Sequence, residues 1–326
     1  MTGRFDWRPL ALLPALMLVA LPAVGSLPTW VTLTVAGLAI GMIIFVIASG
    51  LTLVFGLMDV LNFGHGVFIA FGAYVAIAML TPLAGWSGAD SMARNLGAIG
   101  VAMLAAMIVA AALGWAFERL IVRPVYGQHL KQILITMGGM IIGEELIKAI
   151  WGPQLWPLPL PQTLKGAVLI GDAAIERFRL LAVAVGLVVF ALMSWVLART
   201  KVGLLIRAGV QDREMVECLG YRIRRLFVGV FVAGSALAGL GGVLWAYYQQ
   251  GVVPQIGAQV NVLLFIVIII GGLGSTLGCF VGALLVGLMM NYTGFLAPKV
   301  ALFSNIGLMV LVLLWRPQGL YPVARR

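Results

Sequence analysis

Charged residues are scarce in this chain of 326 residues. Lysine, arginine, aspartate and glutamate make up 10% of the sequence, whereas a soluble domain has about 25%. Hydrophobic residues make up 62%, and the mean hydropathy is +1.10. A soluble core could not bury this much apolar surface. Composition therefore excludes a soluble protein and predicts an all-α, polytopic bundle of transmembrane helices.

Residues that often carry catalysis or bind metals are also few. The two cysteines, Cys218 and Cys279, lack metal-site spacing, and we expect no disulfide between them. The two histidines, His65 and His129, are too few for a histidine metal centre. The sequence has no GxxxxGK[ST] phosphate loop, no HExxH and no GxSxG. We therefore predict no enzyme activity, no bound metal and no cofactor of its own.

Long apolar runs, by contrast, fill most of the sequence. A helix needs about 20 apolar residues to cross a bilayer. We expect eight to ten spans, and the ten candidates are approximately 10–28, 32–55, 60–80, 97–117, 132–151, 179–198, 227–250, 260–273, 277–296 and 299–315. The short segment 260–273 could instead be a broken or half helix.

The first apolar segment has two interpretations. Arg4 and Arg8 precede it, as in a signal peptide. Pro14, Pro22 and the lack of a clear small-residue cleavage site favour a retained helix instead. We therefore predict an extra N-terminal membrane helix at 1–28 and a second unit at 29–322.

The distribution of basic residues predicts the orientation. If both termini lie on one side, that side and its loops carry 15 of the 21 lysines and arginines, and the other side carries six. Basic residues accumulate in cytoplasmic loops. We therefore expect cytoplasmic termini, a cytoplasmic 199–226 loop and an external 152–178 loop stiffened by its WPLPLPQ run. The net charge of +10 then indicates membrane lipids, not nucleic acid, as the anionic partner.

The 199–226 loop concentrates the charge of the chain, with 10 of its 32 Lys, Arg, Asp and Glu residues. Its apolar residues recur at helical spacing, as do polar ones beside them, which predicts one or two short amphipathic helices. Gly203 and Gly220 lie near the ends of this pattern. The alternative is a solvated loop whose basic residues only fix topology. The apolar residues are Leu204, Ala208, Met215 and Leu219.

Two glycine-rich segments, 56–74 and 271–283, interrupt the apolar runs. Aligning Gly64 with Gly274 also aligns Gly72 with Gly282. Corresponding glycine-interrupted segments in two halves are typical of transporters built from repeats. Close helix packing is the alternative explanation.

A few polar residues fall inside the apolar runs. Asn62 and His65 begin the third run, and Glu144, Glu145 and Lys148 lie in the fifth. Ionisable groups in a membrane usually face a bundle interior or a pathway. We expect a buried ion cluster at 144–148, either as internal pairs that hold helices together or as an ion-coupling site. His65 could equally be a neutral histidine bonded to backbone.

Four motifs occur in order and resemble a known family. They are FGLMDVLNFGHGVFIAFGAY (55–74), RAGVQDREMVECLGY leading into FVAGSALAGLGGVL (207–244), IIGGLGSTLGCFVGALLVG (269–287) and LLWRPQGLYP (313–322). Together they resemble the membrane permease of branched-chain amino acid ABC importers, and NFGHG resembles its LivH-type subunit. The resemblance covers roughly residues 30–322, so 29–322 is expected to be the ABC permease domain.

The resemblance implies an inverted-repeat importer permease in a bacterial inner membrane. It would pair with a second permease, a copy or a sister chain. Cytoplasmic ATPase subunits would bind the ATP, and a soluble periplasmic protein would deliver a small amino acid. The 199–226 loop corresponds to the segment that couples to the ATPase, where we expect contacts from Arg207, Asp212, Glu217, Leu219, Gly220 and Tyr221. Val216 departs from the small residue usual at its position.

The translocation path is the remaining expectation. Broken-helix amides near the two glycine segments could bind a substrate carboxylate. The candidates are Asn62, Gly64, His65, Gly66, Gly271, Gly272, Gly274 and Ser275. Relatives of this type also carry urea or short amides, which is one alternative. The other is an ion-coupled secondary transporter that uses Glu144 and Glu145.

Overall fold

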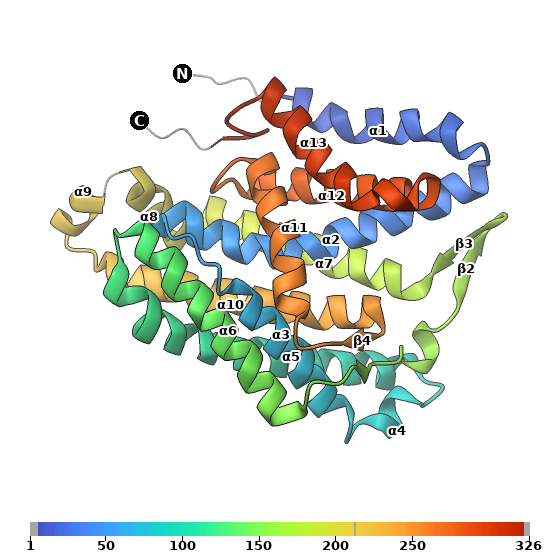
Figure 1. Cartoon of the computed structure of the whole chain (residues 1–326), viewed down its shortest axis with the longest axis horizontal. Coiled ribbons are helices and arrows are strands. Elements are labelled where there is room, and N and C mark those ends of the chain that lie inside the picture. The colour runs from blue at the N-terminus through green and yellow to red at the C-terminus, as the bar shows by residue number, and fades with distance from the viewer. Residues whose placement is uncertain (1–5, 212, 323–326) are drawn as a thin grey trace.

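The computed structural model describes residues 6–211 and 213–322 of the chain as a predominantly helical protein (Figure 1). The α-helices are α1 Arg8–Val24, α2 Leu27–Met58, α3 His65–Leu80, α4 Ala84–Ser87, α5 Met92–Phe117, α6 His129–Trp151, α7 Arg177–Arg199, α8 Lys201–Gln211, α9 Arg213–Cys218, α10 Ile223–Gln249, α11 Ile256–Gly271, α12 Thr276–Leu296 and α13 Ala301–Trp315. Short π and 3-10 turns follow α5 at Glu118–Val122 and Arg123–Val125, and others lie at Gln162–Leu164 and Pro298–Val300.

Each of the ten predicted apolar segments coincides with one helix of 15 residues or more. Among the described residues, five stretches are both long and apolar enough to cross a membrane: Leu27–Gly56, Met92–Val125, Arg177–Arg199, Ile223–Gln249 and Thr276–Leu296. Helices α1, α3, α11 and most of α13 form shorter apolar segments. A multi-helix membrane protein is confirmed, and a count of ten crossings stays a prediction.

The 152–178 segment contains short β-strands, which the prediction of an all-α fold did not include. Strand β1 (Trp156–Pro157) pairs with β4 (Gly251–Val252), and β2 (Ala167–Ile170) forms a hairpin with β3 (Ala173–Glu176). The hairpin projects from the end of the molecule opposite α8 and α9 (Figure 1). The first pairing ties the proline-rich segment to the connection between α10 and α11.

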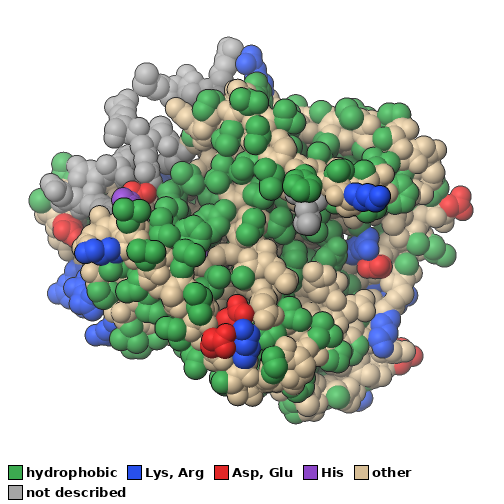
Figure 2. Space-filling model, in the orientation of Figure 1, with side chains coloured by type: hydrophobic (Ala, Val, Ile, Leu, Met, Phe, Trp, Pro, Cys, Tyr) green, Lys and Arg blue, Asp and Glu red, His purple; other side chains and the backbone are tan. Residues whose placement is uncertain are grey.

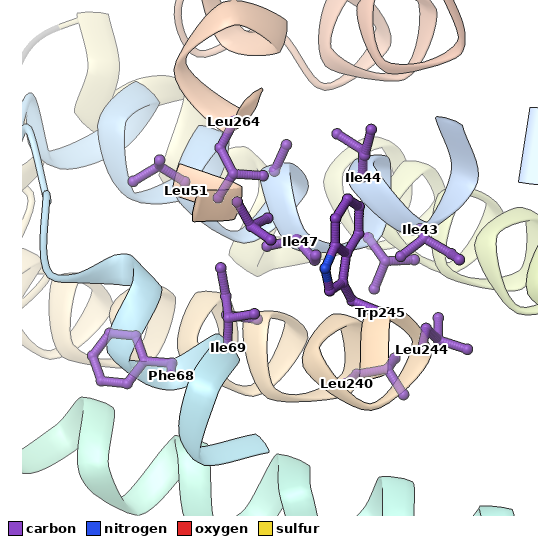
Figure 3. Packing of buried hydrophobic residues seen from close by; sticks show 14 of the residues in the cluster. Ile43, Ile44, Ile47, Leu51, Phe68, Ile69, Leu240, Leu244, Trp245 and Leu264 are labelled. Atoms are coloured by element: carbon purple, nitrogen blue, oxygen red, sulfur yellow. The ribbon is translucent and has the colours of Figure 1, made fainter. Parts of the chain in front are cut away.

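The core forms where α2, α3, α10 and α11 meet. Helix α2 is surrounded, because its faces pack on α7, α10 and α12. Trp245 of α10 lies against Ile44 and Ile47 of α2, with Ile69 of α3 and Leu264 of α11 beside them (Figure 3). A helix buried on all sides must be apolar on all sides, which explains why α2 reads as an uninterrupted apolar run.

Close backbone approach sets the spacing of these helices. A Cβ added to Gly50 of α2 would lie 2.3 Å from the carbonyl oxygen of Gly234 in α10. Glycine at both positions lets the two backbones touch, which is how membrane helices gain packing contacts without a hydrophobic driving force. Helices α2 and α10 run in opposite directions through the centre (Figure 1).

The structure contains an internal correspondence that the glycine alignment did not include. Helices α3 and α11 both have 16 residues. Each begins six residues after a left-handed residue that ends a long helix, Asp59 (φ 54°) or Gln250 (φ 52°). The alignment of Gly64 with Gly274 stays a prediction, since each of these glycines lies in the turn before a helix, α3 or α12. Local backbone shape thus relates α3 to α11, and glycine spacing alone does not reveal this correspondence.

Candidate functional site

The connection between α2 and α3 carries buried polar groups in an apolar setting. Asn62 and His65 both have 0% exposure. The Nε2 atom of His65 lies 3.2 Å from the carbonyl oxygen of Ile47. A carbonyl only accepts, so Nε2 carries the hydrogen and Nδ1 is a lone-pair acceptor. Neither Nδ1 nor either amide atom of Asn62 has a hydrogen-bond partner among the described residues.

Two neighbouring helices hold this connection in place. The N–H of Phe63 donates to Thr136 Oγ1 of α6 at 3.2 Å, and Asn261 Nδ2 of α11 donates to the carbonyl of Phe63 at 2.7 Å. The rings of Phe63 and Phe265 lie 4.6 Å apart. We did not predict roles for Thr136 and Asn261. Neither residue stands out in the sequence, because α6 also contains Gln132 and α11 also contains Gln259.

The first turns of α3 and α11 touch through glycine. A Cβ added to Gly66 would lie 2.6 Å from the carbonyl oxygen of Gly257, and the reverse distance is 2.2 Å. Gly64 precedes α3, and a Cβ there would meet the ring of Phe117 at 2.4 Å. Helix N-termini present unpaired N–H groups and a partial positive charge. Two such ends therefore converge beside Asn62 and His65.

The second predicted part of the path lies elsewhere. Gly271, Gly272, Gly274 and Ser275 form the turn between α11 and α12, at the far end of α11 from Gly257. A helix of 16 residues is about 24 Å long, so the structure does not bring the two predicted groups together.

Backbone packing explains this second glycine group. Gly272 and Gly274 have φ values of 96° and 81°, which favour glycine. The N–H of Tyr321 donates to the carbonyl of Gly271 at 3.0 Å, and the Ser275 hydroxyl caps α12. A Cβ on Gly274 would lie 2.8 Å from the Cα of Gly56. The turn thus fastens the C-terminal segment to the bundle.

The predicted ion cluster forms, but it is not buried. Lys148 Nζ lies 2.9 Å from Glu144 and 2.8 Å from Glu145, and the Glu145 side chain is 65% exposed. The spacing puts all three on one face of α6, while Gly143 and Ile147 occupy the buried face. The cluster also stays within one helix. The expectations that it is internal and that it joins helices are both wrong, because periodicity does not reveal which face has neighbours.

The charged segment contains two short helices, α8 and α9, where one or two were predicted. Leu204, Leu219 and Tyr221 are 60%, 68% and 53% exposed, and Arg207 and Glu217 are also exposed. Large apolar side chains thus lie on the outside among charged ones. Gly203 lies within α8 against the backbone of Leu197.

The segment predicted to couple to the ATPase also includes Val216, Gly220 and Asp212. Gly220 follows α9 with φ 85°. Val216 is buried, so the residue that departs from the family pattern packs within its own chain. Asp212, also predicted to contact a partner, lies outside the described residues.

The molecular surface suits a bilayer. Hydrophobic side chains are spread over the whole face in Figure 2, and charged side chains are few, with one cluster below the middle and the others mostly near the edges. Exposed large apolar residues are spread along α5, α7 and α13, for example Ile108, Val188 and Leu311. Such surfaces are stable in contact with acyl chains and not with water.

Comparison with known proteins places the chain in a family. Residues 33–314 match the model of the branched-chain amino acid transport system / permease component family. The high-affinity branched-chain amino acid transport system permease protein BraD of Pseudomonas aeruginosa is 32% identical, over 88% of this chain and 94% of its own length.

The permease proteins LivH and LivM of Escherichia coli are 27% and 29% identical, each over 87% of this chain and over 92% and 69% of their own lengths. The solved structure of PsaBC from Streptococcus pneumoniae in complex with Fab has a TM-score of 0.40 and 13% identity, over 85% of this chain and 90% of that one. That likeness is too low to support a conclusion. The family match alone covers most of the sequence, and the chain belongs to the permease family of branched-chain amino acid ABC transport systems.

Proposed function

We propose that this chain forms the translocation path of a binding-protein-dependent ABC importer for branched-chain amino acids and couples that path to a separate ATPase. The observation that carries the proposal is the α8–α9 segment. Exposed apolar residues such as Leu204 and Leu219 alternate there with charged ones. A short amphipathic helix seated in a cleft is a means by which a rigid-body motion of one subunit moves another.

In this proposal Arg207, Glu217, Leu219, Gly220 and Tyr221 contact the ATPase, together with Asp212. The ATPase side and both termini lie in the cytoplasm of a bacterium. The 152–178 segment then lies outside, where a soluble binding protein delivers the amino acid. A second permease, a copy or a sister chain, completes the assembly.

Within the membrane, the path passes the convergent ends of α3 and α11. Asn62, Gly64, His65 and Gly66 supply an acceptor nitrogen, an amide and backbone N–H groups for a zwitterion. Asn261 joins this set. The glycine turn Gly271–Ser275 has a packing role in the structure, which leaves it a weaker candidate for the path. Helices α2–α3 and α10–α11, related by opposite direction, are the centre of an inverted repeat.

The N-terminal helix is retained in this proposal. Trp30 Nε1 donates to the carbonyl of Met17 in α1 at 2.8 Å, and α1 packs on α12. Before the helix begins, Asp6 pairs with Arg316 near the C-terminal end, and Tyr321 donates to the backbone of Asp6 at 2.8 Å. The Arg316 guanidinium lowers the pKa of the Asp6 carboxyl.

Of the other functions considered, ion-coupled transport depends on a buried acid pair. Glu144 and Glu145 do not form one, because the Glu145 side chain is 65% exposed and that of Glu144 is only half-buried beside Lys148. The other alternative is transport of urea or short amides by the same type of importer, with only the substrate changed. Measuring uptake of both labelled leucine and labelled urea separates that alternative from the proposal.

The coupling is tested with Leu219→Glu in the complete transport system. Leu219 is 68% exposed, so this change alters the outer face without opening the fold. We expect loss of leucine uptake and of ATPase co-purification, with normal amounts of permease in the membrane. Leu219→Met is the matched control and should retain both. Full uptake by Leu219→Glu, or uptake that persists without the ATPase, would contradict the proposal.

A further inference from the structure

A groove of about 680 Å³ lies between α2, α11, α12 and α13 and has no assigned role. Its lining is mostly aliphatic and includes Ile40, Ile266 and Met290. Its volume falls in the range of small-molecule sites, about 300–1,000 Å³. Apolar walls of this kind suit a branched aliphatic group.

The groove lies at the end of the bundle opposite α8 and α9. Tyr248, the second-last residue of α10, forms part of its lining. Helix α10 has 27 residues and begins five residues after α9 ends, so Tyr248 is about 40 Å from that region. In the proposed orientation the groove therefore lies toward the outside, where substrate arrives.

Three side-chain amides, from Gln259, Asn291 and Asn305, distinguish the groove from a purely apolar surface. Asn305 lines it, is only 2% exposed, and its Oδ1 has no hydrogen-bond partner among the residues that the structure describes. Asn291 Nδ2 is already engaged by the carbonyl of Leu33 at 2.5 Å. A buried carbonyl oxygen without a donor is unfavourable. An ammonium group can supply that donor, whereas a lipid acyl chain cannot.

We propose that this groove is an outward-facing substrate site that binds the aliphatic side chain of a branched-chain amino acid, with Asn305 Oδ1 accepting a hydrogen bond from its ammonium group. The inference rests on the proposed function and adds a residue-level site to it. Because the aliphatic walls would also hold an acyl chain, the test separates amino acid from lipid.

Gly294 allows the groove to be filled without disturbing the fold. It lines the groove on α12, and an added Cβ would meet no atom within 4 Å. Gly307 on α13 is equally open but does not line the groove. We therefore compare Gly294→Leu with Gly307→Leu in the complete system with its ATPase and binding protein. The measurements are uptake of labelled leucine and valine, and the phospholipid retained by the purified complex.

We expect Gly294→Leu to lower the ratio of leucine to valine uptake by about tenfold, because a filled groove discriminates by one methylene. Gly307→Leu should leave the ratio unchanged. Gly294→Ala fills less space and should shift the ratio in the same direction by less. It serves as the test if the leucine variant fails to accumulate.

An unchanged ratio in both Gly294 variants would overturn the inference, as would an equal loss of both amino acids. Loss of bound phospholipid with an unchanged ratio would show that the groove holds lipid instead. Wild-type protein that takes up neither amino acid would reject the proposed function itself, which separates that failure from failure of the groove.

Discussion

At the scale of single residues, the connection between α2 and α3 depends on a few hydrogen bonds. The hydroxyl of Thr136 accepts from the N–H of Phe63 and donates to the carbonyl of Gln132 at 2.7 Å. Thr136 is fully buried. Membrane lipid offers no replacement for either bond. We therefore expect the loss of this hydroxyl to destabilise the folded protein.

We expect Thr136→Val to lower the free energy of unfolding by about 1–3 kcal/mol, because the shape is kept while the N–H of Phe63 loses its acceptor. Thr136→Ser keeps the hydroxyl and should cost clearly less. Thermal unfolding of the purified permease measures both. Equal destabilisation by the two changes would mean that the lost methyl group or packing, not the hydrogen bond, is responsible.

At the scale of helices, glycines fall into two classes that sequence does not separate. Gly50 touches the backbone of Gly234, whereas an added Cβ at Gly138 of α6 would meet nothing within 4 Å. Both lie within helices, where alanine is intrinsically favoured over glycine by about 0.5–1 kcal/mol. At each position, packing therefore determines whether the intrinsic preference for alanine or the steric clash of its added Cβ is larger.

Gly50→Ala should therefore destabilise the protein by about 1–3 kcal/mol, since α2 and α10 must separate. Gly138→Ala should be neutral or stabilising by up to about 1 kcal/mol. The opposite signs are the test, measured by thermal unfolding in the same detergent. A stabilising Gly50→Ala would mean that α2 and α10 are not in backbone contact.

At the scale of the whole molecule, the two cysteines report the orientation. Cys218 is exposed on α9 and Cys279 is buried. A membrane-impermeant maleimide should label the native protein in inside-out vesicles and leave right-side-out vesicles unlabelled. Cys218→Ser should abolish the signal. Labelling only in right-side-out vesicles would reverse the proposed orientation.

A cysteine placed in the β2–β3 hairpin completes this measurement. Leu169 is 73% exposed on β2, and in a Cys218→Ser background Leu169→Cys should label from the opposite side. The two positions together determine whether the chain between them crosses the membrane an odd number of times. Labelling of both from the same side would require a revised number of spans.

Sequence reasoning succeeded where a property is local. Apolar runs gave all ten long helices, and spacing gave α8 and α9 within the charged segment. It failed where the outcome depends on neighbours. The spacing of Glu144, Glu145 and Lys148 correctly paired them, but only the packing of α6 reveals that this face turns outward. The hydrogen bonds of Thr136 and Asn261 join segments too far apart in sequence for any spacing rule.

The glycine contact between α3 and α11 means that two halves of the protein meet without side chains. At the point where Gly66 meets Gly257, only main-chain atoms face each other. Glycine at both positions allows this close contact whatever the surrounding side chains are, whereas any side chain substituted there would hold the two helices apart. If the halves separate during transport, the gap that opens there is lined first by amides and carbonyls. Those groups are the same for every cargo, so in the proposed function selection among amino acids depends on side chains elsewhere along the route.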